Sequence, residues 1–499
     1  MILAWWQNLP LFLILFPLMC GVACSALRGK AARYAAAVMT AAESAGMAVL
    51  LWYTASGNVD FTYAMGEIGA PFGNELRAGP TEALTGLAFA LVLTLCVIGG
   101  SHSLTEDVEP KRLNLFGVMI GLLTAATAAI VFTNDLFTAY VFIEIMTLSA
   151  GALIAVTNRG KALFSSARYM VMNLLGSGLF LLGLSMLYAL TGQLLFPQIA
   201  AAVDALIAGN SYSVPMYLAF LLMTMGLCIK SALYPFHTWL PDAYSNATAV
   251  SGALLSSLVS KLYIFLLIKI ALRAAGEEAF IRRIGDVLFL YAAVGTVLGS
   301  VHALFQRKFS RVIAYSSVAQ IACVYLGIAL GSAEGTAAAL FYILAHSAAK
   351  SMLFLTSHKL RRACGGADGL EDLRGAANRS PLAGLAFLVG ACSLVGIPGL
   401  GGFASKLYLA QAAISGGGWR MPVLLGLLAV STALNVAYML RTVLILYSRE
   451  KPPGEAGQPK ARDPAFAAAM AVLIGLNLFL GVCGEPVLDL INRGLALFS

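Results

Sequence analysis

Runs of roughly 20 apolar residues, separated by short polar stretches, recur along the whole chain of 499 residues. A helix of about 20 apolar residues crosses the hydrocarbon core of a bilayer, so each run predicts a transmembrane helix. The pattern predicts an all-α polytopic membrane protein with about fourteen spans. The predicted spans cover residues 9–27, 33–54, 82–101, 114–132, 135–156, 168–191, 216–240, 249–272, 284–304, 312–331, 337–357, 383–412, 421–448 and 465–482.

The polar connections predict the topology. Residues 55–81 alternate in polarity and turn at glycines, which predicts a small β-hairpin. Of the 32 Lys and Arg residues, about twenty lie on one predicted side of the membrane and about six on the other. Since cytoplasmic connections carry the excess of positive charge, the hairpin and both chain termini are predicted to lie outside the cytoplasm, in a protein of the cell (plasma) membrane. The larger group includes Lys451, Lys460 and Arg462.

Composition agrees with a membrane protein and excludes other classes. Hydrophobic residues make up 60% of the chain and charged residues 11%, against about 45–50% and about 25% in soluble domains. The eight cysteines are scattered without a CxxC pair, so neither an iron–sulfur or zinc site nor any other cofactor is predicted. The topology explains the net charge of +8, and no nucleic-acid partner is predicted.

Two predicted spans combine a lysine with a helix-breaking sequence. Lys230 is followed by Pro235 in the seventh span, and Lys406 follows GIPGLGGFA in the twelfth. This odd offset of five spans predicts two inverted five-helix repeats with broken helices 7 and 12 at matching positions, the usual layout of an ion pathway. The predicted units are residues 1–112, the repeats 113–275 and 276–450, and residues 451–499.

Ionisable side chains lie within the predicted spans. Glu144 follows Asp135 by about nine residues and so lies roughly 14 Å deep. An unpaired charge there costs about 2.5–3.5 kcal/mol, so Glu144 needs a partner, and we predict Lys230. Because burial disfavours a charged ammonium group, lysines at this depth can exchange protons near neutral pH. The predicted proton relay consists of Glu144, Lys230, Lys261, His346, Lys350 and Lys406.

Each lysine taken alone has a simpler explanation, since a static ion pair or a side chain that extends to the interface also places a lysine in a span. Lys269, near a span end, is predicted to extend to the interface. His237 follows the break and is a candidate entrance or a plain interfacial residue, while Arg441 stays charged and is predicted to be structural or field-setting. The histidines at span ends and in connections are left outside the predicted site: His102, His302 and His358.

The choice of ion follows from the oxygen ligands available. A sodium site needs several converging oxygens, and the predicted spans offer essentially one carboxylate, Glu144. Protons are therefore favoured over sodium as the transported ion. Sodium remains an alternative, because backbone carbonyls at the helix breaks could also bind it.

Four segments resemble a known family. KSALYPFHTWLPDAY, AHSAAKSMLFL, GIPGLGGFASKLYL and FIEIM are similar to the antiporter-like subunits shared by respiratory complex I (NADH-quinone oxidoreductase), the Mrp-type Na⁺/H⁺ antiporters (their D-like subunit) and the membrane-bound hydrogenases. The resemblance covers most of residues 115–450 and implies a hydrated proton route near the midplane. It places the family's glutamate and lysines at Glu144, Lys230, Lys261, Lys350 and Lys406. Some members carry glutamate where Lys406 stands, so the resemblance does not fix the outer proton exit.

The resemblance implies a proton-translocating subunit of a larger membrane complex. Redox chemistry or cation exchange would take place in partner subunits, among them homologous antiporter-like subunits, and this chain would have no catalytic centre of its own. Two alternatives remain open. One is an Mrp-type Na⁺/H⁺ antiporter subunit with no redox partner, and the other is a non-conducting scaffold in which buried ion pairs only hold helices together.

Overall fold

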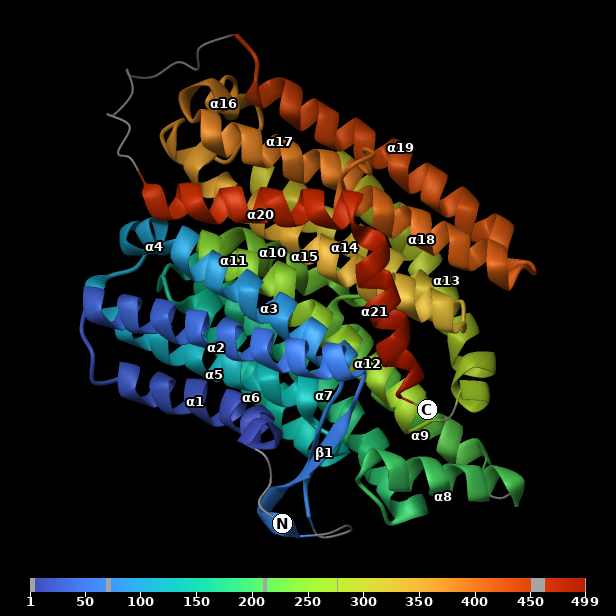
Figure 1. Cartoon of the computed structure of the whole chain (residues 1–499). Coiled ribbons are helices and arrows are strands. Elements are labelled where there is room, and N and C mark those ends of the chain that lie inside the picture. The colour runs from blue at the N-terminus through green and yellow to red at the C-terminus, as the bar shows by residue number, and fades with distance from the viewer. Residues whose placement is uncertain (1–4, 69–72, 210–212, 276, 450–462, 499) are drawn as a thin grey trace.

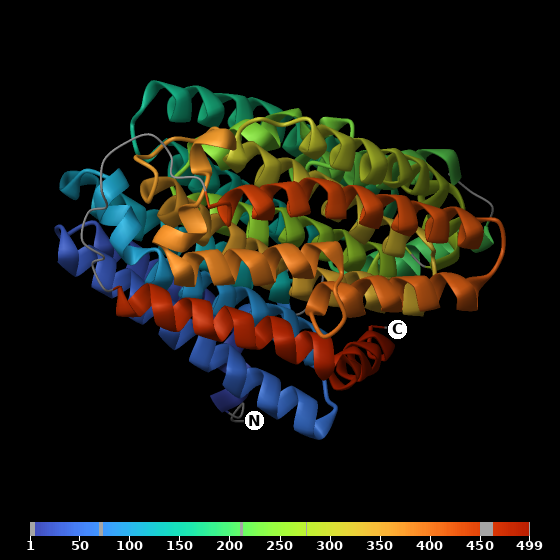
Figure 2. The ribbon, with the colours of Figure 1, turned by 90° about the horizontal axis from the view of Figure 1, so that it is seen from above.

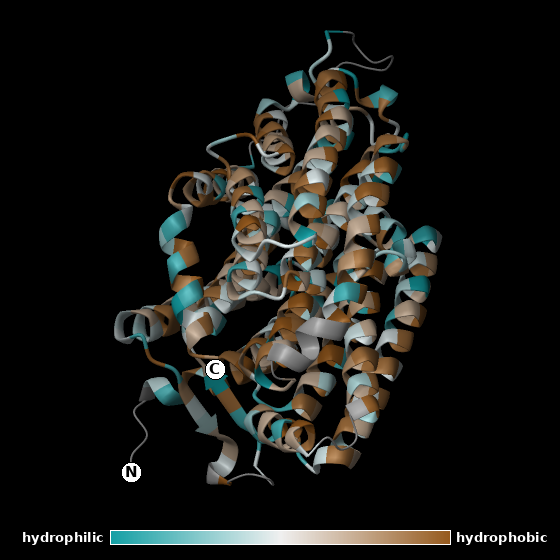
Figure 3. Ribbon diagram, turned by 90° about the vertical axis from the view of Figure 1, so that its right-hand side faces the viewer, coloured by the Kyte–Doolittle hydropathy of each residue, from teal (hydrophilic) through white to brown (hydrophobic). Residues whose placement is uncertain are grey.

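The computed structural model describes residues 5–68, 73–209, 213–275, 277–449 and 463–498. Among these residues, 13 helices are long and apolar enough to cross a membrane, and one bent helix pair brings the number to 14 if it is a single span. The prediction of a polytopic all-helical membrane protein is confirmed. The long helices run alongside one another in one bundle (Figures 1 and 2), and apolar residues predominate along them (Figure 3). Lys451, Lys460 and Arg462 lie outside the described residues.

The first part of the chain forms three long helices and a hairpin. Strands β1 and β2 pair in antiparallel register with Phe61 opposite Ala78, which confirms the hairpin predicted for residues 55–81. The C-terminal segment contacts this hairpin, because Arg77 of β2 donates a hydrogen bond to the Leu497 carbonyl (2.5 Å). The elements are α1 (Leu9–Cys24), α2 (Lys30–Gly57), β1 (Phe61–Ala64), β2 (Glu75–Ala78), α3 (Pro80–Gly99) and α4 (Ser101–Asp107).

The middle of the chain contains one interrupted helix. Helix α9 ends at Ser231, where Ala232 adopts a left-handed φ of 62° and Leu233 N–H closes the helix end on the Cys228 carbonyl (2.9 Å). Pro235 has no N–H with which to continue the helix, and a 3₁₀ turn (Phe236–Trp239) follows. The elements are α5 (Leu113–Phe132), α6 (Leu136–Ala155), α7 (Gly160–Thr191), α8 (Phe196–Ala208), α9 (Ser213–Ser231), α10 (Leu240–Asn246), α11 (Ala249–Leu254), a π-helical turn (Leu255–Val259) and α12 (Ser260–Arg273).

A second interruption lies between α17 and α18. Gly396 has a φ of 94°, a left-handed conformation that favours glycine, and its N–H closes α17 on the Cys392 and Ser393 carbonyls (3.0 Å each). The inverted relation of the two repeats stays a prediction. The elements are α13 (Glu277–Leu304), α14 (Phe309–Ala329), α15 (Ala333–Arg362), α16 (Ala376–Arg379), α17 (Pro381–Val395), α18 (Gly401–Gly416), α19 (Arg420–Leu446), α20 (Pro464–Val482) and α21 (Gly484–Ala496).

Helices α12 and α15 lie at the centre of the bundle. The most apolar stretches of Ala249–Arg273 and Ala333–Arg362 are completely buried within the chain, whereas only 33% of that of α19 is buried. Polar side chains on α12 and α15 are therefore surrounded by protein, the environment that ionisable groups require inside a membrane.

Candidate functional site

The structure brings Glu144 of α6 and Lys230 of α9 together. Lys230 Nζ lies 3.5 Å from Glu144 Oε1 and donates a hydrogen bond to Thr147 Oγ1 at 2.9 Å. The Ser177 hydroxyl, from α7, also donates to the Glu144 carboxylate. The side chain of Lys230 is 0% exposed and that of Glu144 is 26% exposed. The cation is thus enclosed by the chain, while its carboxylate partner reaches the outer face of the bundle.

A glycine contact between α7 and α9 makes room for this pair. A Cβ atom on Gly226 would lie 2.5 Å from the Gly176 carbonyl oxygen, and one on Gly176 would lie 3.1 Å from Lys230 Cγ. Such a close approach of two helix backbones requires the small residue. On the far side of Lys230, the Tyr263 ring lies 5.5 Å from Nζ, within reach of a cation–π interaction.

Lys261 and Lys350 are buried on the two central helices. Lys261, the second residue after the π-helical turn, donates to the Ser256 carbonyl and to Ser260 Oγ (3.3 Å). Lys350 donates to the Ile313 carbonyl (2.8 Å) and to Ser316 Oγ (2.5 Å), both on α14. In the described part of the chain, no carboxylate lies within ion-pair distance of either ammonium. Neutral oxygens are their partners, so neither charge is fixed by a counter-charge.

His346 lies one turn before Lys350 on α15. Its side chain is 3% exposed, and neither ring nitrogen has a hydrogen-bond partner among the described residues. A small cavity next to the ring is also lined by Gln320 and by Ser393 and Ser405 of α17 and α18. Because buried polar groups normally have partners, a water molecule in this cavity is the natural one.

Lys406 bridges the interruption between α17 and α18. Its Nζ donates to the carbonyls of Leu394 (3.2 Å) and Val395 (2.8 Å) and to Thr432 Oγ1 (3.1 Å). The last carbonyls of a helix have no partner in the helix itself and carry its negative dipole end, so an ammonium is favoured there. The interruption therefore provides the site that holds Lys406 inside the bundle.

The two auxiliary residues lie in different surroundings. His237 is 6% exposed, stacks on Tyr234 with ring centroids 4.9 Å apart, and lies 5.9 Å from the ring of His302. Its role as an entrance stays a prediction. Arg441 lies on the exposed face of α19 and donates to the Leu304 carbonyl (3.3 Å).

The prediction that Lys269 extends to the interface is wrong. Its side chain is 0% exposed, and Nζ donates to the Val131 and Thr133 carbonyls at 2.7 Å each. These are carbonyls at the C-terminal end of α5, which lack partners within that helix. A lysine near a span end can extend to water or bind the carbonyls at the end of a neighbouring helix. Lys269 does the second, because the end of α5 lies within hydrogen-bond distance.

The prediction of essentially one carboxylate within the spans is also wrong. Glu43 of α2 is 1% exposed, and neither of its oxygens has a partner in the described residues. Glu82, in the first turn of α3, is 0% exposed and pairs with Arg77 at 2.5 Å. The signal for Glu43 was present in the sequence, as a glutamate in the middle of the apolar run 33–54.

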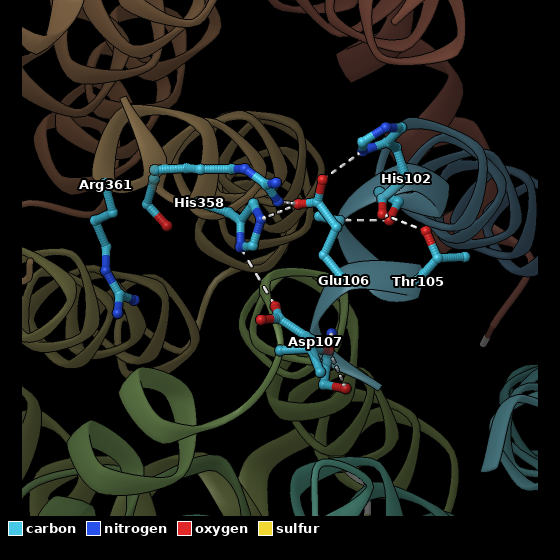
Figure 4. A network of polar contacts seen from close by, with 12 residues as sticks. His102, Thr105, Glu106, Asp107, His358 and Arg361 are labelled. Atoms are coloured by element: carbon cyan, nitrogen blue, oxygen red, sulfur yellow. Dashed lines mark hydrogen bonds and ion pairs between the residues drawn. The ribbon is translucent and has the colours of Figure 1, made fainter. Parts of the chain in front are cut away.

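Two of the histidines left outside the predicted site, His102 and His358, belong to a network between α4 and the end of α15 (Figure 4), whereas His302 lies beside His237. His358 lies 3.3 Å from both Glu106 and Asp107, His102 lies 3.0 Å from Glu106, and Arg362 also pairs with Glu106. Burial, together with the nearby Lys359 ammonium, lowers the pKa of His102 below its usual value. The i,i+4 spacing of His102 and Glu106 was the only signal of this network in the sequence. Within the described residues, no group of three or more His, Cys, Asp or Glu could hold a metal ion.

Residues 133–434 match the model of the NADH:quinone oxidoreductase/Mrp antiporter, TM family. The match covers more than half of the chain. The chain belongs to this family. All six residues of the predicted relay lie within the matched region, whereas Arg441 lies outside it.

Two curated relatives and one solved structure illustrate the breadth of the NADH:quinone oxidoreductase/Mrp antiporter family. NADH-quinone oxidoreductase subunit N from Desulforudis audaxviator is 31% identical over 498 residues, which covers 97% of this chain and 96% of the relative. The D subunit of the Na⁺/H⁺ antiporter from Bacillus subtilis is 26% identical, over 84% of this chain and 83% of the relative. A chain of the archaeal membrane-bound sulfane sulfur reductase superposes with a TM-score of 0.88, at 25% identity, over 98% of this chain and 97% of its own.

Proposed function

We propose that this chain translocates protons as an antiporter-like subunit of a multisubunit membrane complex. The observation that carries the proposal is a series of lysines that starts at the Glu144–Lys230 pair (3.5 Å) and continues through α12, α15 and α18. Lys230, Lys261 and Lys350 are buried, and Lys406 is half-buried. In this proposal Lys230 is the central carrier and Glu144 modulates its charge. The lateral relay is formed by Lys261, His346 and Lys350, and Lys406 is the distal gate.

The partners of these ammonium groups support an exchangeable charge. Lys261, Lys350 and Lys406 are held by carbonyl and hydroxyl oxygens, which hydrogen-bond to an ammonium without a fixed counter-charge. Arginine could not serve in the same way, because a guanidinium does not lose its proton in proteins. The choice of lysine at all four positions therefore fits proton transfer better than a static network.

The partner subunits supply the driving reaction. Members of the family are named as subunits of multisubunit complexes, one of an NADH-quinone oxidoreductase and another of a Na⁺/H⁺ antiporter. We propose that this chain lies in the cell membrane with the hairpin and both termini outside the cytoplasm, as the positive-inside rule indicates.

A second candidate is a cation/proton antiporter subunit without a redox partner, which the similarity to the Bacillus subtilis antiporter favours. The two candidates differ in their neighbours and in their response to sodium. Purification of the intact complex and identification of its subunits would separate them, because redox subunits are expected only in the first case. Sodium-dependent proton movement without an added electron donor is expected only in the second.

The test of the proposal is Lys230→Ala in the intact complex, reconstituted in proteoliposomes. We expect the variant complex to assemble and to lose proton translocation. The matched control is Lys161→Ala, which changes an exposed lysine and should leave translocation unchanged. A scaffold would give the opposite result, with loss of assembly or with translocation retained in the assembled Lys230→Ala complex.

A further inference from the structure

His346 stands between Lys261 and Lys350 in the proposed relay, yet in the described structure no hydrogen bond joins either lysine to the imidazole or to the other lysine. Lys261 is held at the Ser256 carbonyl, within the π-helical turn that precedes α12. Lys350 is held by Ser316 Oγ of α14 (2.5 Å). A proton that moves between the two lysines therefore needs an intervening group.

Two serine hydroxyls belong to residues at or next to those that hold the two lysines. Ser256 Oγ and Ser317 Oγ are hydrogen-bonded to each other at 3.0 Å, and both side chains are 0% exposed. Ser256 is the residue whose carbonyl binds Lys261, and Ser317 follows directly after Ser316, which binds Lys350. Each end of the hydroxyl pair thus adjoins the anchor of one lysine.

The local backbone explains why a hydroxyl and an ammonium converge at Ser256. A π-helical turn widens the helix and releases carbonyls from the regular i→i−4 ladder. The Ser256 carbonyl is therefore available to Lys261, while its hydroxyl points across to α14. The remaining hydrogen bond of Ser317, to the Ile313 carbonyl, is long at 3.4 Å and leaves the hydroxyl free to turn.

We propose that the Ser256–Ser317 hydroxyl pair carries the proton between Lys261 and Lys350. This inference rests on the proposed function. A hydroxyl has one hydrogen to donate and two lone pairs to accept, so it can take a proton on one side and release its own on the other. The Lys261 ammonium releases one proton, Ser256 and Ser317 each accept one proton and pass their own onward, and neutral Lys350 accepts one. In this proposal water molecules link Lys261 to Ser256 Oγ and Ser317 Oγ to Lys350, and the Ser256–Ser317 hydrogen bond is the direct link between them. No charge remains on any serine, and rotation of the hydroxyls restores the starting state.

The test compares Ser256→Ala and Ser317→Ala with the unaltered complex, and measures protons translocated per turnover of the driving reaction. Each variant removes one oxygen atom and is expected to assemble normally. Loss of one bridging hydrogen bond should lower translocation about fivefold or more. The double variant should lose no more than either single variant, because the two hydroxyls act as one unit. Ser300→Ala on α13 is the control, since this buried hydroxyl donates only within its own helix in the described structure and should leave translocation unchanged.

The outcomes distinguish the two proposals. If Lys230→Ala keeps translocation, the proposed function itself fails. If Lys230→Ala abolishes translocation while Ser256→Ala and Ser317→Ala translocate normally, the hydroxyl path alone is overturned. Loss of translocation in His346→Gln, together with normal serine variants, would place the path through the imidazole and its cavity instead.

Discussion

Lys230 and Glu144 form an ion pair of unequal burial, with 0% of the lysine side chain and 26% of the glutamate side chain exposed and 3.5 Å between Nζ and Oε1. The carboxylate is therefore the part of the pair that a neighbouring subunit or water can reach. A change of charge near Glu144 acts directly on the enclosed ammonium, because a low-dielectric surrounding screens it weakly.

Glu144→Gln tests this coupling. The amide keeps the size of the side chain but removes the charge that stabilises the Lys230 ammonium, so proton translocation should fall roughly tenfold, as expected for a loss of about 1.4 kcal/mol. Translocation in proteoliposomes measures the effect. Glu109→Gln is the control, because this glutamate is 70% exposed on a connection. Equal translocation in both variants would show that Lys230 works without its partner.

Gly226→Ala should separate α7 from α9. The added Cβ would lie 2.5 Å from the Gly176 carbonyl oxygen, so the backbones must move apart, at a cost of about 1–3 kcal/mol. We expect a lower thermal denaturation temperature together with reduced translocation, because the Glu144–Lys230 contact depends on this approach. Gly178→Ala on α7 is the matched control, since nothing lies within 4 Å of its Cβ position. A Gly226→Ala complex as stable as this control would contradict the prediction.

Lys269→Met tests whether Lys269 only stabilises the end of α5 or also takes part in proton transfer. The thioether fills the space of the alkyl chain but leaves the Val131 and Thr133 carbonyls without their donor, which should cost about 1–3 kcal/mol of folding free energy. The denaturation temperature of the complex should fall, while the protons translocated per turnover of the assembled complex stay unchanged. Normal stability with impaired translocation would assign Lys269 to the proton path.

Lys406→Arg and Lys406→Met distinguish structure from proton exchange at the distal lysine. Arginine can still donate to the Leu394 and Val395 carbonyls, so this variant should keep the fold near the interruption, but its permanent charge should stop proton release. Methionine should lose both properties. Assembly and proton translocation are measured for both variants; we expect Lys406→Arg to assemble without translocating and Lys406→Met to be impaired in both. A Lys406→Arg complex that translocates protons would exclude Lys406 as a site of proton exchange.

The network between α4 and α15 predicts a dependence of stability on pH. Burial and the Lys359 charge lower the pKa of His102 in the folded state below the unfolded value near 6.5. Above about pH 6.5 the ring is neutral in both states, and as the pH falls below this value the unfolded state binds the proton more readily, so stability decreases. The effect should be small, because 47% of the side chain is exposed. A flatter profile of denaturation temperature between pH 5 and 7 in His102→Gln is expected, and an unchanged slope would contradict it.

The prediction of the helices and of the hairpin from sequence succeeded because the deciding property is local, although the equally local signal of Glu43 in the run 33–54 was missed. Runs of apolar residues give the spans, and the alternating, glycine-containing stretch gives the hairpin between β1 and β2. The partner of Glu144 could be proposed because a carboxylate within a span needs a cation, and Lys230 stood in the most distinctive segment of the chain.

Only the tertiary structure decided which oxygen atoms surround each buried cation. Lys269 reaches the end of α5, and Ser256 meets Ser317, through contacts between residues that are far apart in the sequence. These contacts depend on how closely two helices approach and on where a helix is interrupted, as at Gly226 and at the π-helical turn. Hydropathy specifies that a helix is buried in the membrane but does not specify its neighbours, because in lipid the packing of small residues, rather than apolar character, determines which helices come together.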